Sequence, residues 1–358
     1  MRTFRVELGA DAHPVQVGAG ALDQAGRLAR EAGVAAGRAL IVTDSNVARL
    51  YGERAAASLK AAGFAPRTLE VAAGEQSKSL ATLERVYDAL AEAELDRSGP
   101  VFALGGGVVG DLAGLAAATY MRGVPLVQVP TTMVAQADSA LGGKTAVNHP
   151  RAKNLIGAFY QPRLIVADVA TLASLPEREF REGLAEVIKY GAIMDAPMVE
   201  ALERGLDAIL RRSPAALEEI VARSLRHKAA VVASDPREGG RRKILNYGHT
   251  LGHALEASSG YGNFLHGEAV AIGMVVAGRL SQAFTGLAAA EAGRLERLIA
   301  RAGLPNAMPA GWRGEDLVRA MRLDKKRSGD GVEFVLLDRL GHALTRKLGF
   351  AEILPHLG

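Results

Sequence analysis

The chain has 358 residues, of which 49% are apolar and 23% are charged, and it has no cysteine. This composition is typical of a soluble globular protein, and it excludes disulfides, thiolate metal ligands, Fe–S clusters and cysteine nucleophiles. A net charge of +4, with only 5% aromatic residues and with basic residues interspersed among acidic ones, gives little support for nucleic-acid binding.

The N-terminal segment is polar and alternating, and every later apolar run is broken by glycine or charge before 18 residues. We therefore expect no export signal and no membrane segment. Any metal site must use histidine, aspartate or glutamate as its ligands.

The first half of the chain alternates short apolar strands with helical stretches. Strands are predicted at 38–44, 100–107, 124–130 and 163–168, with a helix at 81–95. This order is typical of an α/β domain with a mostly parallel sheet covered by helices, in which ligands bind at the carboxyl ends of the strands.

After about residue 176 the strand signals fade and long helical patterns follow, as at 214–235 and 267–284. We expect two domains, an α/β domain at 1–175 and a helical domain at 176–358. The boundary lies near Pro176.

The segment 101–114, VFALGGGVVGDLAG, places Gly105, Gly107 and Gly110 in the order G-x-G-x-x-G between a predicted strand and a predicted helix. Such glycines let a backbone approach a dinucleotide pyrophosphate at a helix N-terminus, although glycine-rich turns also occur for structural reasons alone. The usual acidic residue about 20 positions downstream is missing, because the next strand ends in Thr131 and Thr132. Asp44 ends an earlier strand instead, and its alternative role is a helix N-cap.

Three of the eight histidines lie between positions 249 and 266. His249 and His253 are four residues apart and share one helix face, and His266 follows after a short loop. With Glu186 as a carboxylate these residues form a plausible site for zinc or a similar cation, whereas a packing role is the alternative for any single histidine. The motif H-E-x-x-H is absent from the sequence, which disfavours a zinc peptidase.

Lysine, arginine and amide side chains are dense at 138–145, at 149–157, at 226–246 and at 322–331. A solvated charged face would explain any one of these segments. Together with a metal site and a glycine loop they indicate a polyanionic substrate.

Six segments occur together in one order: GGGVVGDLAG, VPTTMVAQADSALGGKTAVN, KNLIGAFYQP, EVIKYG, LNYGHTLGHALE and HGEAVAIGM. In this order and spacing the sequence resembles the 3-dehydroquinate synthase family over essentially the whole chain. The resemblance implies an N-terminal Rossmann-like domain that binds NAD, an all-helical C-terminal domain that binds metal and substrate, and commonly a homodimer. It also implies a cytoplasmic lyase that uses NAD and Zn²⁺ or Co²⁺ to convert 3-deoxy-D-arabino-heptulosonate 7-phosphate to 3-dehydroquinate and phosphate.

The same resemblance implies roles for individual residues. Glu186, His249 and His266 match metal ligands, and His253 matches a histidine that faces substrate. The cofactor contacts it implies are Asp44, Glu75, Lys78, Gly105, Gly106, Gly107, Val108, Val109, Gly110, Asp111, Thr131, Thr132, Asp138, Lys144, Lys153, Thr171 and Leu172. The substrate-site groups it implies are Asp138, Lys144, Asn154, Lys189, Lys228, Glu238, Arg242 and Asn246.

Two further cations are implied at the substrate phosphate. Arg122 resembles an arginine that reaches the phosphate from the neighbouring subunit, and of Lys325 and Lys326 we prefer Lys325. The sequence departs from the family pattern at Ala137, Ala140 and Pro236, none of which removes a charged or ligating group.

Three alternatives stay open. Another sugar phosphate cyclase, such as one making 2-deoxy-scyllo-inosose or 2-epi-5-epi-valiolone, would keep NAD, metal and most of these residues. A glycerol dehydrogenase-like oxidoreductase has a similar glycine loop but does not need the cluster of cations. A non-catalytic NAD-binding protein is disfavoured by the intact candidate metal ligands Glu186, His249 and His266.

Overall fold

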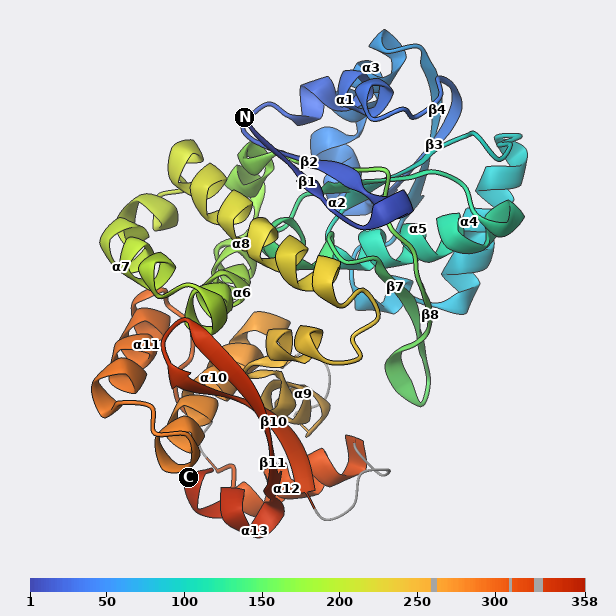
Figure 1. Cartoon of the computed structure of the whole chain (residues 1–358). Helices are drawn as coiled ribbons and strands as arrows, with labels where there is room; N and C mark the ends of the chain where they lie inside the picture. The colour runs from blue at the N-terminus through green and yellow to red at the C-terminus, as the bar shows by residue number, and fades with distance from the viewer. Residues whose placement is uncertain (259–262, 309–310, 325–330, 358) are drawn as a thin grey trace. The chain divides into compact units, whose positions relative to one another are not determined.

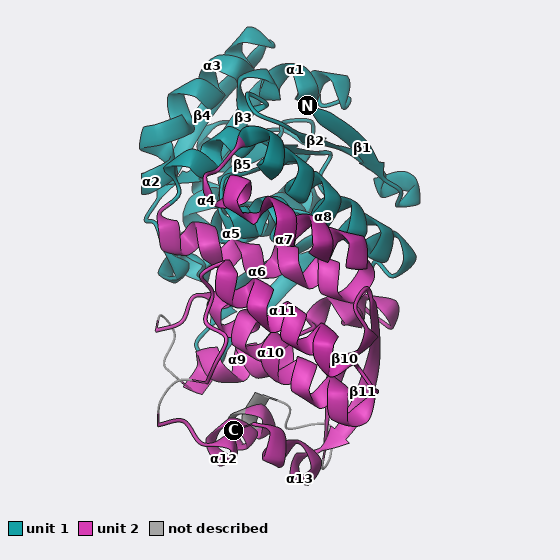
Figure 2. Cartoon of the chain, turned by 90° about the vertical axis from the view of Figure 1, so that its left-hand side faces the viewer, with its two compact units in different colours: residues 1–175, 214–237 teal, residues 176–213, 238–358 magenta. Residues whose placement is uncertain are grey.

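The computed structural model describes residues 1–258, 263–308, 311–324 and 331–357 (Figure 1). The chain forms two compact units, and Figure 2 colours them separately. Unit 1 contains residues 1–175 and 214–237, and unit 2 contains residues 176–213 and 238–358. The chain therefore passes from one unit to the other three times.

Unit 1 is built on a seven-stranded sheet with the strand order β1-β2-β9-β6-β5-β3-β4. All neighbouring pairs are parallel except β1 and β2. The central strands are buried throughout, as expected for a parallel sheet with both faces covered. The strands are β1 (Arg2–Val6), β2 (His13–Val17), β3 (Gly37–Asp44), β4 (Phe64–Val71), β5 (Val101–Gly105), β6 (Leu126–Pro130) and β9 (Leu164–Ala167).

Successive side chains along each strand point to opposite faces of this sheet. On β3, Leu40 and Val42 join a core with helices α4 and α5, whereas Ala39 and Ile41 join a second core with α1 and α3. The helices of unit 1 are α1 (Ala25–Glu31), α2 (Ser45–Val47), α3 (Glu53–Ala61), α4 (Leu80–Glu92), α5 (Gly107–Thr119) and α8 (Pro214–Ser234). An antiparallel hairpin, β7 (Lys144–His149) and β8 (Ala152–Phe159), completes the unit.

Unit 2 is mainly helical. Its longest helix, α10 (His266–Phe284), is buried along most of its length and contacts α6, α9 and α11. The other helices are α6 (Glu177–Met194), α7 (Ala196–Leu210), α9 (His249–Ser258), α11 (Ala289–Arg301), α12 (Gly314–Asp324) and α13 (Phe350–Ile353). An antiparallel hairpin of β10 (Gly331–Arg339) and β11 (His342–Gly349) packs Val332, Phe334 and Leu336 into the core of this unit.

Short helical turns connect these elements. They are η1 (Gly9–Asp11), η2 (Leu22–Gln24), η3 (Ala48–Gly52), η4 (Glu75–Ser77), η5 (Tyr120–Arg122), η6 (Ala135–Ser139), η7 (Val169–Ser174), η8 (Arg241–Asn246) and η9 (Leu354–His356). Within the described residues, no helix is both long and apolar enough to cross a membrane.

The predicted fold class is confirmed: a Rossmann-like parallel sheet in the N-terminal part is followed by helices in the C-terminal part. Two details differ from the expectation. Unit 2 contains the β10–β11 hairpin, so it is not all-helical. Helix α8 lies in unit 1, where its buried face contacts β1, β2, η6 and η7.

Candidate functional site

A cluster of three metal-ligand side chains lies in unit 2, one on each of three helices. Glu186 comes from α6, His249 from the first residue of α9 and His266 from the first residue of α10. Glu186 Oε1 lies 3.5 Å from His249 Nε2 and 3.3 Å from His266 Nε2. The donor atoms of the three residues all lie within 4.8 Å of one another, so the structure brings the predicted metal ligands together.

Close contacts between backbones hold these three helices at a short separation. A Cβ atom on Gly267 would lie 1.9 Å from the carbonyl oxygen of Glu182 on α6. A Cβ atom on Gly273 would lie 2.0 Å from the carbonyl oxygen of Gly248, next to His249. Only glycine permits these approaches, which place the start of α10 against both α6 and the start of α9.

The ring of His249 is oriented by the backbone. Its Nδ1 lies 3.1 Å from the carbonyl oxygen of Tyr247, which can only accept, so Nδ1 donates and the lone pair of Nε2 faces Glu186. Burial lowers the pKa of His249 to about 3, because the charged form would lose its hydration. The ring is therefore neutral, as a metal ligand must be.

His266 lies between two carboxylates. Its Nε2 faces Glu186, and its Nδ1 lies 3.4 Å from Oε2 of Glu256. Burial acts to lower the pKa of His266, but the hydrogen bonds and negative charges of Glu186 and Glu256 outweigh it and raise that pKa. A carboxylate with two imidazoles is a donor set that suits zinc or cobalt, and a bound divalent cation would replace the proton on His266.

Two other residues border this cluster. Lys189, one helical turn after Glu186, forms a buried ion pair with it. The ring centroid of His253 lies 5.5 Å from that of His249 and 6.1 Å from that of His266. His253 groups with Glu256 and His266 rather than with Glu186, and its side chain is exposed. This placement fits a residue that faces a substrate.

The glycine loop of unit 1 joins β5 to α5 at the carboxyl edge of the sheet. A Cβ on Gly106 would meet Thr132 at 2.9 Å, and one on Gly107 would meet Ser139 Oγ at 3.2 Å. Helix α5 begins after Gly106 with no side-chain cap, so the N–H groups of its first turn are available to an anion. Thr131 Oγ1 is buried beside this loop and has no hydrogen-bond partner among the described residues. These features fit a dinucleotide pyrophosphate.

Two predicted cofactor residues already have structural partners. Asp44 caps α2, because its Oδ1 accepts from the N–H groups of Asn46 at 2.9 Å and Val47 at 3.1 Å. The Thr171 hydroxyl donates to the Asp168 carbonyl and accepts from Gln136 Nε2. Asp44 therefore has the N-cap role that the sequence offered as its alternative, and this role uses one of its two oxygens.

A polar network joins predicted residues that lie far apart in the sequence. Lys78 is 5% exposed and binds both Asp111, at the second turn of α5, and Asn154 on β8. Asn148 donates through Nδ2 to Glu75 Oε1 at 2.7 Å, and its Oδ1 accepts from the N–H of Asn154 at 2.9 Å. The structure thus brings the cofactor candidates Glu75, Lys78 and Asp111 together with the substrate candidate Asn154 in unit 1.

Other predicted polar residues lie at three places. In unit 1, Lys228 on α8 pairs with Asp138 in η6, Lys144 is the first residue of β7, and Lys153 is the second residue of β8. In unit 2, Asn246 Nδ2 donates to Glu238 Oε1 at 3.3 Å, and Arg242 is 2% exposed. Arg122 lies in the exposed turn η5 with φ +68°. The predicted residue Lys325 and its neighbour Lys326 lie outside the described residues.

Three residues at these sites were not predicted from the sequence. Asn148 joins Glu75 to Asn154, Glu256 faces His266, and the fully buried Gln136 donates to Thr171 and to two backbone carbonyls. Each lies inside one of the six segments that resemble the family. The sequence of the segment does not indicate which distant residue each side chain contacts.

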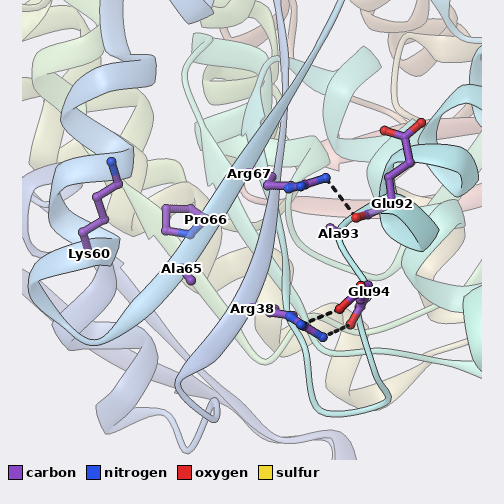
Figure 3. A pocket seen from close by; sticks show the side chains of 8 residues that line it. All are labelled: Arg38, Lys60, Ala65, Pro66, Arg67, Glu92, Ala93 and Glu94. Atoms are coloured by element: carbon purple, nitrogen blue, oxygen red, sulfur yellow. Dashed lines mark hydrogen bonds and ion pairs between the residues drawn. The ribbon is translucent and has the colours of Figure 1, made fainter.

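A cavity of about 490 Å³ lies away from these residues, near the amino ends of β3 and β4. Figure 3 shows that its two arginines are already engaged, Arg38 by Glu94 and Arg67 by the carbonyl of Glu92. Ligands of parallel sheets bind at the opposite, carboxyl edge. We therefore assign this cavity no part in the site.

Comparison with known proteins gives a consistent result. The family model "3-dehydroquinate synthase N-terminal" matches residues 68–182, and "3-dehydroquinate synthase C-terminal" matches residues 183–327. The 3-dehydroquinate synthase of Symbiobacterium thermophilum is 51% identical over 344 residues, which is 95% of this chain and 95% of that protein.

Solved structures share the fold over nearly the whole chain. A 2-deoxy-scyllo-inosose synthase complexed with carbaglucose-6-phosphate, NAD⁺ and Co²⁺ superposes with a TM-score of 0.90 at 26% identity and covers 99% of both chains. The 2-epi-5-epi-valiolone synthase of Streptomyces hygroscopicus, with NAD⁺ and Zn²⁺ bound, has a TM-score of 0.87 at 30% identity and covers 96% of this chain and 95% of that one. Glycerol dehydrogenase of Schizosaccharomyces pombe, at 19% identity and a TM-score of 0.70 over 96% of this chain and 87% of that one, shares the fold alone.

Proposed function

The chain belongs to the 3-dehydroquinate synthase family, and on this premise we propose that it converts 3-deoxy-D-arabino-heptulosonate 7-phosphate into 3-dehydroquinate and orthophosphate. The observation that carries the proposal is the near-full-length likeness to enzymes of this name, at 51% identity over 344 residues. The enzyme is accordingly an NAD- and metal-dependent carbon–oxygen lyase.

The reaction needs a redox cofactor although it causes no net oxidation. When bound, NAD would take a hydride from C5 of the substrate and later return it, and a divalent cation held by Glu186, His249 and His266 would lower the pKa of the substrate hydroxyl. The transient C5 ketone acidifies the neighbouring C6 proton, so phosphate leaves by elimination. Return of the hydride, ring opening and an intramolecular aldol closure would then complete the carbocycle.

The chain's own residues bind, orient and neutralise charge in this scheme. Glu186, His249 and His266 would hold the cation, and the exposed His253 beside them would move protons. Gly106 and the N-terminus of α5 would hold the pyrophosphate of NAD. We propose accordingly that unit 1 binds NAD and that unit 2 holds the metal.

Cationic and amide groups would bind the carboxylate and phosphate of the substrate. Lys144, Asn154 and Lys228 lie in unit 1, while Lys189, Arg242 and Asn246 lie in unit 2. We further propose a cytoplasmic homodimer in which Arg122 of one subunit serves the phosphate site of its neighbour. The exposed turn that carries Arg122 supports this assignment.

The alternative function is that of a different sugar phosphate cyclase, because the TM-score to 2-deoxy-scyllo-inosose synthase is 0.90. The sequence identity to that enzyme is 26%, against 51% to a 3-dehydroquinate synthase. Lys228, Arg242 and Asn154 suit a substrate that carries a carboxylate as well as a phosphate, which favours the heptulosonate.

A phosphate-release assay tests the proposal. Purified protein receives the heptulosonate 7-phosphate, catalytic NAD and Zn²⁺ or Co²⁺, while absorbance at 340 nm is followed. We expect phosphate release without accumulating NADH, and its loss on addition of a chelator. NADH that rises in step with substrate loss would support an oxidoreductase instead, and turnover of glucose 6-phosphate but not of the heptulosonate would support the competing cyclase.

A further inference from the structure

Glu256 is not one of the three candidate metal ligands, but its side chain contacts one of them, His266. It is on α9, seven residues after His249, and its side chain is 11% exposed. Its Oε2 lies 3.4 Å from His266 Nδ1, while the other ring nitrogen of His266 lies 3.3 Å from Glu186 Oε1. A different carboxylate therefore faces each nitrogen of the His266 ring.

The two ring nitrogens of a neutral imidazole have different roles, since one carries a proton and the other carries a lone pair. A carboxylate that accepts the proton of Nδ1 leaves the lone pair on Nε2, where a cation can bind. His249 follows the same rule with a backbone partner, because its Nδ1 donates to the Tyr247 carbonyl. Both rings thus present Nε2 toward Glu186.

The two histidines differ in how firmly packing holds them. The side chain of His249 is 11% exposed, whereas that of His266 is 35% exposed and belongs to the first residue of its helix. Packing restrains His266 less, so its orientation depends more on hydrogen bonding. Glu256 is the partner that faces its Nδ1.

We propose that Glu256 is a positioning residue that accepts the Nδ1 proton of His266 and so directs Nε2 to the metal. The inference rests on the metal site of the proposed function. It goes beyond the ligand set because Glu256 itself does not touch the cation.

A competing role for Glu256 is visible in the same geometry. His253, Glu256 and His266 also form a group whose donor atoms lie within 4.8 Å of one another. In that arrangement Glu256 would be a ligand. A glutamine at position 256 separates the two roles, because its amide oxygen still accepts a hydrogen bond from Nδ1 but is a poor ligand for zinc.

The experiment measures metal binding without sugar phosphate. Wild type, Glu256→Gln, Glu256→Ala, His266→Ala and the control Glu203→Ala are titrated with Zn²⁺ against a chromogenic chelator, and the visible absorption of the Co²⁺ forms is recorded. Glu203 is a matched control because it too is a paired glutamate of unit 2, bound to Arg294 on a different helix pair. Thermal unfolding of each variant verifies folding.

We expect Glu256→Ala to lower the metal affinity about 10- to 100-fold and to change the Co²⁺ absorption bands. Glu256→Gln should stay within about threefold of wild type and keep the bands, since it keeps the hydrogen bond. Wild-type affinity in Glu256→Ala would overturn the inference, and so would equal losses in the alanine and glutamine variants, which would identify Glu256 as a ligand. Protein that binds the metal in this way but releases no phosphate would contradict the proposed reaction and leave the role of Glu256 supported.

Discussion

Lys228 and Asp138 form an ion pair although ninety residues separate them in the sequence. Lys228 Nζ lies 2.5 Å from Asp138 Oδ1 and donates to the Asp138 carbonyl at 2.9 Å. The two side chains are only 8% and 17% exposed. The pair connects α8 to η6 within unit 1, so a candidate substrate lysine also fastens this helix to the sheet domain.

Breaking this pair from one side should destabilise unit 1, because it leaves one charge in a mostly buried place. We expect Lys228→Met to cost about 3 kcal/mol. Asp138→Asn combined with Lys228→Met should cost less than the sum of the two single changes. Denaturant unfolding of the four proteins measures this coupling, and strictly additive changes would contradict it.

Replacing Lys144 and replacing Arg242 by alanine should have different effects on the stability of the fold. Lys144 is exposed, so Lys144→Ala should lower kcat/KM by about 100-fold through lost charge-assisted hydrogen bonds while the melting temperature stays unchanged. Arg242 is 2% exposed and is among the largest fully buried side chains, so Arg242→Ala should lower both activity and melting temperature. Activity assays run beside thermal unfolding separate the two, and an Arg242→Ala protein of unchanged stability would contradict the distinction.

The close approach of α10 to α6 predicts opposite effects for two glycine substitutions. Gly267→Ala should destabilise the protein by about 2 kcal/mol or more and weaken zinc binding, because the added Cβ would overlap the Glu182 carbonyl and displace His266. Gly205→Ala is the matched control, since it lies within α7 with no atom within 4 Å of the added Cβ. It should stabilise by up to about 1 kcal/mol. Melting temperatures that shift in the same direction would count against this packing.

His13 should make stability depend on pH. It is 1% exposed in β2, and burial lowers its pKa below the usual 6.5, with Arg5 and Arg163 acting in the same direction. The unfolded chain therefore binds a proton before the folded chain does, so stability is present above pH 6.5 and is lost as the pH falls below it. His13→Leu should show a smaller drop in melting temperature between pH 7.5 and 5.5 than wild type. A drop of equal size would show that His13 does not cause the dependence.

The sequence predicted the elements whose signals are local. The strand, glycine turn and helix at 101–119 could be expected because apolar runs and glycines act over a few residues. The shared face of His249 and His253 followed from helix geometry alone, and the structure places His266 and Glu186 beside His249.

Features that depend on distant partners escaped prediction. The amphipathic pattern of α8 says that one face is buried but not which unit buries it. Asn148 and Glu256 have their partners on other elements, so nothing in their own segments marks them. The β10–β11 hairpin is different, because it carries a local signal: an apolar run precedes Gly341, which has φ +82° in the turn.

The three passages of the chain between the units bear on how the protein is synthesised and how it could be engineered. During synthesis the strands of unit 1 leave the ribosome first, and 38 residues of unit 2 follow them. Only then do residues 214–237 emerge, so helix α8 can pack against the sheet only after part of unit 2 has been made. A single cut at residue 175 would yield a fragment lacking the helix that contacts β1 and β2. A chimaera that exchanges whole units with a relative would therefore need three junctions, near residues 175, 213 and 237.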